Sequence, residues 1–329
     1  MITMTELARI AGVSQPTVSR VLNGNPSVNP DVAKWVLDCA KQHNYQPNLI
    51  ARSLNGNKTY LLAAIVPDIS NPYFAELIKA LEREAGKMGY SILIFNSDYD
   101  HEKELHYLKL LQQYRVDGLF LAPACEDAQS LLPFHQLSIP WLVVTNYIEN
   151  ADSIYISHEK AGQMVASHLV DVKAKRFLFI GRRKDRKFLG FERGLRGLGV
   201  DTRQCLTVFW EETLEETLSL MAGYLEDLNV RAGIFATNDM DALVTLHTLV
   251  NAGIDIPGKA ALVGFDNTFI SQRTLPGITS VSQPIGEMAR LAIEHLLLKM
   301  KEGAGTDVSH VELTATLAVR ASTLSDTAF

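Results

Sequence analysis

The sequence predicts an all-α helix-turn-helix head followed by an α/β body, in which two doubly wound parallel sheets form two subdomains. Three helix patterns, each with its own start and stop signals, occupy the first 45 residues. After residue 57, short apolar runs alternate with amphipathic stretches, which is typical of parallel α/β units. The order strand, loop, helix begins twice, at "LLAAIVP" and again at "RFLFIG". This repetition favours two similar subdomains over one long sheet.

Length and composition are those of an ordinary globular protein with more than one domain. The chain has 329 residues, of which 47% are hydrophobic and 21% are charged. Its three cysteines are widely separated and lack the CxxC spacing of a metal or redox site. No apolar run is long enough to span a membrane, and the N-terminus lacks a signal-peptide core. We therefore expect a cytoplasmic protein with no membrane partner.

The charges are distributed unevenly along the chain. Residues 1–60 carry six Lys or Arg against three Asp or Glu, although the whole chain has a net charge of −6. A small basic segment on an acidic remainder predicts two separate tasks, and the basic one suits nucleic acid. The densest positive cluster lies elsewhere, in "IGRRKDRKFLGF", where five of the six positions from Arg182 to Lys187 are cationic.

The first two helices of the head are marked by their caps. Thr3 and Glu6 have the spacing of a capping box, and Gly12 can take the left-handed conformation that ends a helix. Ser14 caps a second helix, "QPTVSRVL", in which Pro16 falls in the first turn, where a missing N–H is harmless. The sequence therefore predicts two short helices joined by a tight turn.

The third helix begins at Pro30, with Asn29 as its cap. We expect its apolar face to comprise Val32, Val36, Leu37 and Ala40. Three short helices with a glycine in the first turn are typical of a helix-turn-helix, although a generic three-helix cap would carry the same signals.

The second helix separates polar from apolar side chains. Its inward side carries Val18, Val21 and Leu22. Its outward side carries short polar or basic groups suited to base edges and phosphates: Gln15, Thr17, Ser19 and Arg20. Such a helix can enter a major groove, which favours the helix-turn-helix over the generic cap.

Three motifs, "TELARIAGVSQPTVSRVLNG", "YQPNLIARSL" and "VPDISNPYFAEL", closely resemble the lactose-repressor family of bacterial transcription regulators. The resemblance runs from about Thr3 to near the C-terminus. It implies a sequence-specific regulator, most often a repressor, that acts as a homodimer on a pseudopalindromic operator in double-stranded DNA. It also implies a body that resembles the periplasmic sugar-binding proteins.

The resemblance divides the chain into a DNA-binding domain at 1–46, a hinge helix and linker at 47–57, and an effector-binding and dimerisation domain at 58–329. In this last domain, we expect the first subdomain at about 58–156 and 285–312, and the second at about 157–284 and 313–329.

DNA contacts are implied for the head and for the hinge. Gln15 and Pro16 occupy base-reading positions, where a proline offers only apolar contact, so the operator sequence is left open. Leu54 matches a leucine that is wedged into the minor groove and bends the duplex, although it could be an ordinary linker residue. The other implied contacts are Thr3, Ser14, Thr17, Ser19, Arg20, Asn23, Asn48 and Ala51.

An effector is expected between the subdomains, because ligands of doubly wound sheets bind beyond the carboxyl ends of the strands. Those ends are rich in Asn, Asp and aromatic residues, as a polyhydroxylated ligand requires. The resemblance implies that the effector contacts are Tyr73, Phe74, Thr145, Lys187, Trp210, Asn238 and Asp266. Each has a structural alternative, such as the core for Phe74 or a turn cap for Asp266.

Two of these positions depart from the usual family pattern. Thr145 stands where many sugar-responsive members have Asp, and Lys187 stands where they have Arg. The loop before Lys187 leads from a strand into a helix, a geometry that binds anions, and it carries Arg182, Arg183, Lys184 and Arg186. We therefore expect a carbohydrate-derived effector that could be a sugar phosphate or sugar acid. The alternative is that this loop only faces water.

Nothing in the sequence supports catalysis or a cofactor. There is no GxxxxGK[ST] phosphate loop, no GxSxG elbow and no HExxH metal pair, so we expect no enzyme. The alternative function is a solute-binding protein of the periplasmic sugar-receptor type without a regulatory role. That alternative would require a signal peptide and no basic head.

Overall fold

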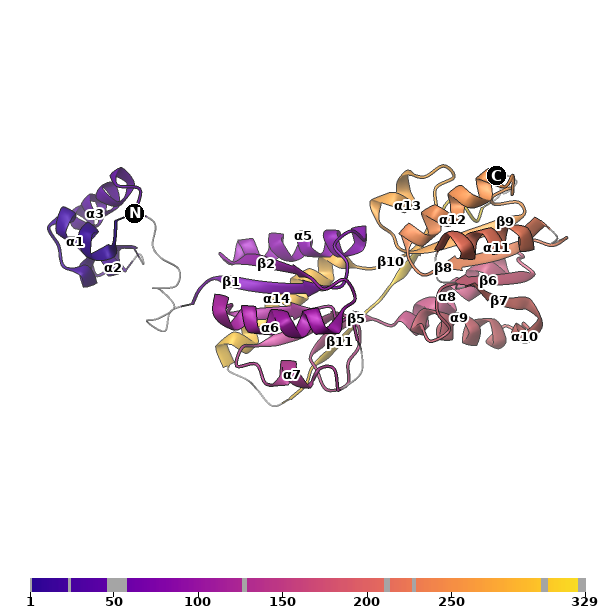
Figure 1. The fold of residues 1–329 in the computed structure, drawn as a ribbon, viewed down its shortest axis with the longest axis horizontal. Coiled ribbons are helices and arrows are strands. Elements are labelled where there is room, and N and C mark those ends of the chain that lie inside the picture. Colours follow the sequence, from indigo (N-terminus) through magenta and orange to yellow (C-terminus); the bar gives the residue numbers. More distant parts are fainter. Residues whose placement is uncertain are drawn as a thin grey trace. The chain divides into compact units, whose positions relative to one another are not determined.

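The computed structural model describes residues 2–22, 25–45, 58–125, 129–209, 214–226, 229–302 and 307–324. The chain divides into two compact units (Figure 1). One comprises Met1–Tyr60 with Gln113–Arg115, and the other comprises Leu61–Gln112 with Val116–Phe329. Within the described residues, no helix is long and apolar enough to cross a membrane.

The described residues of the first unit form the helices α1 (Met4–Ala11), α2 (Gln15–Leu22) and α3 (Pro30–Gln42). The predicted capping box is present, because the Glu6 amide donates to the Thr3 hydroxyl (3.2 Å) and the Thr3 amide donates to the Glu6 carboxylate (2.7 Å). Gly12 ends α1 with a φ of 68°. Asn29 caps α3 by accepting from the Asp31 amide at 2.8 Å. The predicted start signals of α1 and α3 are therefore confirmed.

The core between these helices confirms all but one of the apolar positions that the sequence suggests. Val18 and Val36 are fully buried, but Leu37 is 50% exposed, so its placement on the apolar face of α3 was wrong. Leu37 lies 100° around the helix from Val36, which turns it away from α1 and α2. Cys39 occupies the buried position instead. The Trp35 indole N–H donates to the Ala11 carbonyl at 3.0 Å and so fastens α3 to α1.

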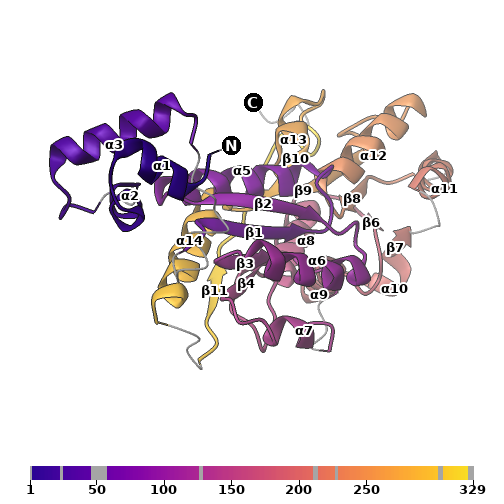
Figure 2. The same cartoon turned by 60° about the vertical axis from the view of Figure 1, so that its left-hand side comes forward.

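The first sheet of the second unit has the strand order β11-β5-β4-β3-β1-β2, and all its strands are parallel. Its strands are β1 (Leu61–Val66), β2 (Ser91–Asn96), β3 (Gly118–Leu121), β4 (Trp141–Thr145), β5 (Ser153–Ile156) and β11 (His310–Leu313). The helices that cover it are α5 (Pro72–Lys87), α6 (His101–Tyr114), α7 (Leu132–His135) and α14 (Ile285–Glu302). Helices α5 and α14 share one core with the sheet, and α6 and α7 share another on the opposite face (Figure 2).

The second sheet has the order β12-β10-β9-β8-β6-β7, in which only β12 is antiparallel to its neighbour. Its strands are β6 (Arg176–Ile180), β7 (Leu206–Phe209), β8 (Ala232–Ala236), β9 (Ala260–Asp266), β10 (Thr279–Ser282) and β12 (Thr316–Ala318). The accompanying helices are α8 (His158–Asp171), α9 (Arg186–Gly197), α10 (Thr202–Cys205), α11 (Leu214–Glu226), α12 (Asp239–Asn251) and α13 (Phe269–Arg273). Two doubly wound, largely parallel sheets are thus confirmed.

Along its described residues, the chain crosses between the two sheets three times. It leaves the first sheet after β5 and enters α8, which packs against α9 of the second subdomain. It returns after β10 through α14, which packs against α5 of the first subdomain, and it crosses again between β11 and β12. Helices α8 and α9 approach closely where Gly190 lacks a side chain. A Cβ added at this position would lie only 2.1 Å from the Glu159 carbonyl oxygen. Each subdomain is therefore assembled from segments that are distant in the sequence.

Candidate functional site

The first candidate site is the outward face of α2 in the head. Gln15, Pro16 and Arg20 are exposed, and Thr17 and Ser19 are partly exposed. Val18 and Val21 on the opposite face are buried against α1 and α3. This helix can therefore present its predicted contact residues to a groove while its apolar side remains in the core.

Some predicted DNA contacts also stabilise the head. Ser14 caps α2 by accepting from the Thr17 amide at 3.3 Å, and the two hydroxyl oxygens lie 2.8 Å apart. The Thr3 hydroxyl lies 3.0 Å from a carboxylate oxygen of Glu6 within the capping box. Four of the predicted DNA contacts, and the predicted effector contact Trp210, lie outside the described residues: Asn23, Asn48, Ala51, Leu54 and Trp210.

The second candidate site lies at the carboxyl ends of the strands in the two sheets. Thr145 ends β4 with a φ of 82°, and Asp266 ends β9 with a φ of 100°. Both side chains are buried, with exposed fractions of 5% and 6%. A positive φ is costly for residues with a side chain, and such strain gathers at ligand sites.

Asp266 is connected to the first subdomain through Gln283. The Gln283 amide donates to the Asp266 carboxylate at 2.7 Å, and its oxygen accepts from the Tyr73 hydroxyl at 3.1 Å. Burial raises the pKa of Asp266 to about 7, although the nearby Lys187 ammonium opposes that rise. Asp266 can therefore change its charge near neutral pH while it remains hydrogen-bonded.

Gln283 was not among the predicted contacts. Its signal in the sequence was its place directly after β10, where the chain leaves the second sheet. Phe74 is 9% exposed and belongs to the core of the first subdomain, with its ring 5.2 Å from that of Tyr73. The structure thus brings Tyr73 and Asp266 into one chain of hydrogen bonds, and it places Phe74 in the core beside Tyr73.

The Lys187 ammonium contacts two groups of the second subdomain. Its ammonium donates to the Thr237 carbonyl at 2.8 Å and lies 4.2 Å from the centre of the Phe265 ring. The pKa of Asp241 is raised by burial, against the effects of the Thr237 hydroxyl and of Lys187. An ammonium beside buried carboxylates offers hydroxyl groups both a donor and acceptors.

Asn238 is part of the same subdomain edge. It caps α12, because its side-chain oxygen accepts from the Asp241 amide at 2.8 Å while its NH₂ donates to the Asp241 carboxylate at 3.0 Å. Both ends of this amide already have partners within the protein. Asn238 therefore supports Asp241 in position, and a ligand contact would use its second amide N–H or the remaining lone pair of its oxygen.

In the cation loop, Arg182–Lys187, the helix N-terminus that the sequence suggests as an anion site is already capped. Asp185 caps α9 by accepting from the Lys187 amide at 2.7 Å, so a carboxylate of the chain itself occupies the helix N-terminus. The side chains of Arg182, Arg183 and Arg186 are exposed, and the Arg183 guanidinium lies 5.9 Å from the Phe188 ring centre. Anion binding at this loop would therefore rest on side-chain cations rather than on helix amides.

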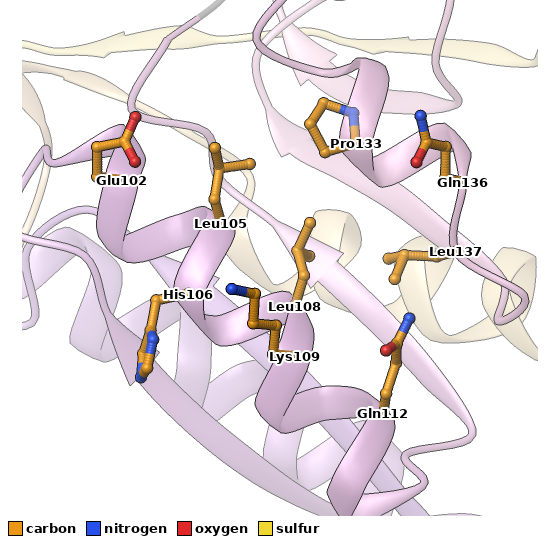
Figure 3. A pocket seen from close by; sticks show the side chains of 9 residues that line it. All are labelled: Glu102, Leu105, His106, Leu108, Lys109, Gln112, Pro133, Gln136 and Leu137. Atoms are coloured by element: carbon orange, nitrogen blue, oxygen red, sulfur yellow. The ribbon is translucent and has the colours of Figure 1, made fainter.

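A groove of about 600 Å³ also lies between α6 and α7 on the outer face of the first sheet. Figure 3 shows Leu105, Leu108 and Leu137 along it, with Glu102 and Lys109 among the polar residues that line it. None of the predicted site residues lines this groove. Among the residues that the structure describes, no group of three or more His, Cys, Asp or Glu side chains could hold a metal ion.

The fold and the two sites define a DNA-binding regulator whose body is built like a solute-binding protein. Residues 3–48 match the family described as bacterial regulatory proteins, lacI family, and residues 166–323 match the periplasmic binding protein-like domain. The chain belongs to the lacI family of bacterial transcription regulators. The resemblance inferred from the sequence is thereby confirmed, as is the prediction that the protein is not an enzyme.

Relatives match along nearly the whole chain. Catabolite control protein A of Priestia megaterium is 32% identical over 98% of this chain and 99% of its own. The ribose operon repressor of Halalkalibacterium halodurans is 32% identical over 98% of this chain and 97% of its own. A crystal structure of a periplasmic binding protein/LacI transcriptional regulator from Alkaliphilus metalliredigens, complexed with D-xylulofuranose, is 28% identical with a TM-score of 0.69, over 81% of this chain and 100% of that one.

Proposed function

We propose that the protein is an operator-binding repressor that acts as a cytoplasmic homodimer and responds to a sugar-like effector between its subdomains. The observation that carries the proposal is the polar outward face of α2 on a capped three-helix head. The body adds the hydrogen-bonded chain from Tyr73 through Gln283 to Asp266, which joins the two subdomains at the strand ends. An effector that binds one arrangement of the subdomains more tightly would shift the affinity for DNA.

DNA recognition by α2 is tested with Gln15→Ala. A genome-wide footprint first supplies an operator, and fluorescence anisotropy then compares that operator with a scrambled duplex. Loss of a base-edge contact should weaken operator binding by about 1–3 kcal/mol and leave scrambled DNA unaffected. Gln42→Ala, an exposed glutamine on α3, is the matched control. Equal losses on both duplexes, or none, would remove α2 as the reading helix.

A sugar effector is supported by the residues at the strand ends and by two of the relatives. One relative is named for a ribose operon, and another was crystallised with D-xylulofuranose. Lys187, Asp241 and Asp266 offer donors and acceptors for hydroxyl groups, and Tyr73 offers a ring. The exposed arginines of the cation loop favour a phosphate or carboxylate on that sugar.

Calorimetry with the full chain distinguishes the charged from the neutral effector. D-Ribose, D-xylulose, the 5-phosphates of both sugars and D-ribonate are titrated separately. An anionic effector should bind more tightly than its parent sugar and lose that advantage in Arg183→Ala. Tighter binding of a neutral sugar would overturn the anionic form while leaving the sugar effector in place.

A homodimer is supported by apolar side chains that lie on the surface of the second unit. Strand β2 is an edge strand, and Ile94 within it is 46% exposed. Leu275 is 93% exposed. An edge strand presents unpaired backbone groups on which a second copy of the chain can pair. Leu275→Asp should lower the dimer fraction in analytical ultracentrifugation, and an unchanged fraction would remove Leu275 from the interface.

A further inference from the structure

The groove between α6 and α7 takes no part in the two candidate sites described above (Figure 3). Six of its lining residues lie on α6, from Glu102 to Gln112, and the other three lie on or directly after α7, from Pro133 to Leu137. We call it the α6–α7 groove. All of these residues belong to the first subdomain, so a molecule bound here would not bridge the two subdomains.

The α6 wall of the groove is held in place from its inner side. The buried carboxylate of Glu104 accepts from the Ala124 amide at 2.7 Å. The Tyr107 hydroxyl donates to the Asn96 carbonyl at 2.8 Å. These bonds tie α6 to the last residue of β2 and to the segment after β3.

The α7 wall is short but anchored in the core. Phe134 is fully buried, and its ring centre lies 5.7 Å from that of Trp141 in β4. Both walls are therefore fixed by the fold itself. A groove of this kind exists before a ligand arrives, as is usual for small-molecule sites.

The floor of the α6–α7 groove is apolar. Leu108 belongs to the core that the sheet shares with α6 and α7, and Leu105 and Leu137 pack against that core. Figure 3 shows these leucines in the middle of the groove. The volume of about 600 Å³ falls within the range of about 300–1,000 Å³ that is typical of small-molecule pockets. The floor therefore suits a hydrocarbon chain or an aromatic ring.

The rim of the groove offers hydrogen-bond donors to an anion. Among the residues that the structure describes, no hydrogen bond or ion pair engages the Lys109 ammonium, whereas Lys103 on the same helix pairs with Asp98. Gln112 lies three positions after Lys109 and is its neighbour on the helix surface, and Gln136 stands on the other wall. An ammonium with amide N–H groups nearby can bind a carboxylate through charge-assisted hydrogen bonds.

Glu102 limits the negative charge that the groove accepts. It lines the end of the groove opposite Gln112 (Figure 3). Its position on α6 is about 10 Å from that of Lys109 along the helix axis. A single carboxylate at Lys109 avoids contact with Glu102, whereas a group with several negative charges would be repelled more strongly. The groove therefore favours a ligand with one carboxylate.

We propose that the α6–α7 groove binds a monocarboxylic acid with an apolar body, such as an aromatic acid or a medium-chain aliphatic acid. The leucine floor takes up the apolar body, and Lys109 binds the carboxylate with the help of Gln112 and Gln136. The site is distinct from the strand-end site around Asp266, because none of the predicted effector contacts lines the groove. It does not rest on the proposed repressor function.

Calorimetry with the full chain tests the charge of the ligand. The probes are octanoate, 4-phenylbutyrate and their neutral counterparts, octan-1-ol and 4-phenylbutan-1-ol. At least one acid should bind about fivefold more tightly than its alcohol, which is the contribution of a well-placed exposed ion pair. Lys109→Gln should remove this difference. Lys79→Gln, at an exposed position on α5, should preserve it.

Filling the groove tests its floor. Gln112→Trp introduces an indole from an exposed position and should weaken the acid by about tenfold or more, because the ring takes up space in the groove. Gln113→Trp is the matched control, since Gln113 is exposed on the same helix but does not line the groove. Binding of the acid should persist in this control and in Asp266→Asn. Circular dichroism verifies that each variant folds.

Three results would overturn the site. In the first, neither acid binds. In the second, the acids bind no better than their alcohols, or keep their advantage in Lys109→Gln. In the third, Gln113→Trp or Asp266→Asn weakens binding as much as Gln112→Trp does. None of these results affects the operator measurements with Gln15→Ala, so failure of this inference and failure of the proposed function are separable.

Discussion

The two subdomains share one plan but differ in the chemistry of their strand ends. Their strand orders, β11-β5-β4-β3-β1-β2 and β12-β10-β9-β8-β6-β7, place β4 and β9 at the same rank. Thr145 ends β4 and Asp266 ends β9, and both are buried with positive φ. One backbone position thus carries a neutral hydroxyl in the first subdomain and an ionisable carboxyl in the second.

The same contrast between a neutral and a charged side chain appears at the start of α5, which follows β1, and of α9, which follows β6. Asn71 caps α5 by accepting from the Tyr73 amide at 3.0 Å, and Asp185 caps α9 by accepting from the Lys187 amide at 2.7 Å. Tyr73 and Lys187 therefore occupy the same place in their helices. The repeated fold determines where a side chain stands, and the residue type decides whether that place carries charge. We infer that the second subdomain supplies the charged contacts to an effector.

The largest expected effect is on the pH dependence of stability, and it comes from replacing Asp266. Its folded-state pKa of about 7 lies above the ordinary value of 3.8, so the neutral form stabilises the fold at low pH and that stability is lost as pH rises from about 4 to 7. Asp266→Asn removes this loss. Relative to the variant, the wild type should lose up to about 4 kcal/mol of unfolding free energy between pH 4 and 8.5. Urea unfolding at several pH values measures the difference.

Thr145→Val is the matched control for Asp266→Asn, because it changes the equivalent position of the first subdomain without altering a titratable group. Its effect on the unfolding free energy should be the same at every pH. If the two variants responded to pH alike, the contrast in charge between the subdomains would be wrong.

The second prediction tests the close contact of α8 with α9, which supports Lys187. A Cβ on Gly190 would lie 2.1 Å from the Glu159 carbonyl oxygen, so Gly190→Ala must separate the two helices. We expect a loss of about 3 kcal/mol in the free energy of unfolding, measured by urea denaturation. Gly197→Ala, near the end of the same helix, meets nothing within 4 Å and should stabilise the protein by up to about 1 kcal/mol. Similar values for the two variants would contradict the close packing.

The smallest change in stability is expected from removing the uncharged hydrogen bond between Tyr73 and Gln283, which links the two subdomains. Tyr73→Phe removes the hydroxyl that donates to Gln283 at 3.1 Å and leaves the core otherwise filled. The free energy of unfolding should fall by about 1 kcal/mol. Tyr114→Phe, whose side chain is exposed, should change it by less than about 0.5 kcal/mol. A loss for Tyr73→Phe no larger than that of its control would show that this bond contributes nothing to stability.

The sequence predicted helix ends well where the signal lies within a few residues, as capping residues do. Thr3 with Glu6, and Asn29 with Pro30, both cap helices as their spacing indicates. Leu37 was misassigned because the spacing of apolar residues in a helix does not show how wide a face its neighbouring helices cover. Asp185 was overlooked among five cations, although an Asp directly before a helix is a standard cap signal.

The sequence by itself determined the helix and strand pattern, the repeated α/β plan and the family. It also supplied the polar residues at the strand ends. Only the tertiary structure decided which of them work together: Tyr73 and Gln283 are 210 positions apart and meet through one hydrogen bond. Burial and the neighbouring charges raise the pKa of Asp266, and both depend on segments distant in the chain. Caps and periodicity act along the chain, whereas desolvation and charge act across space, so only the folded protein reveals them.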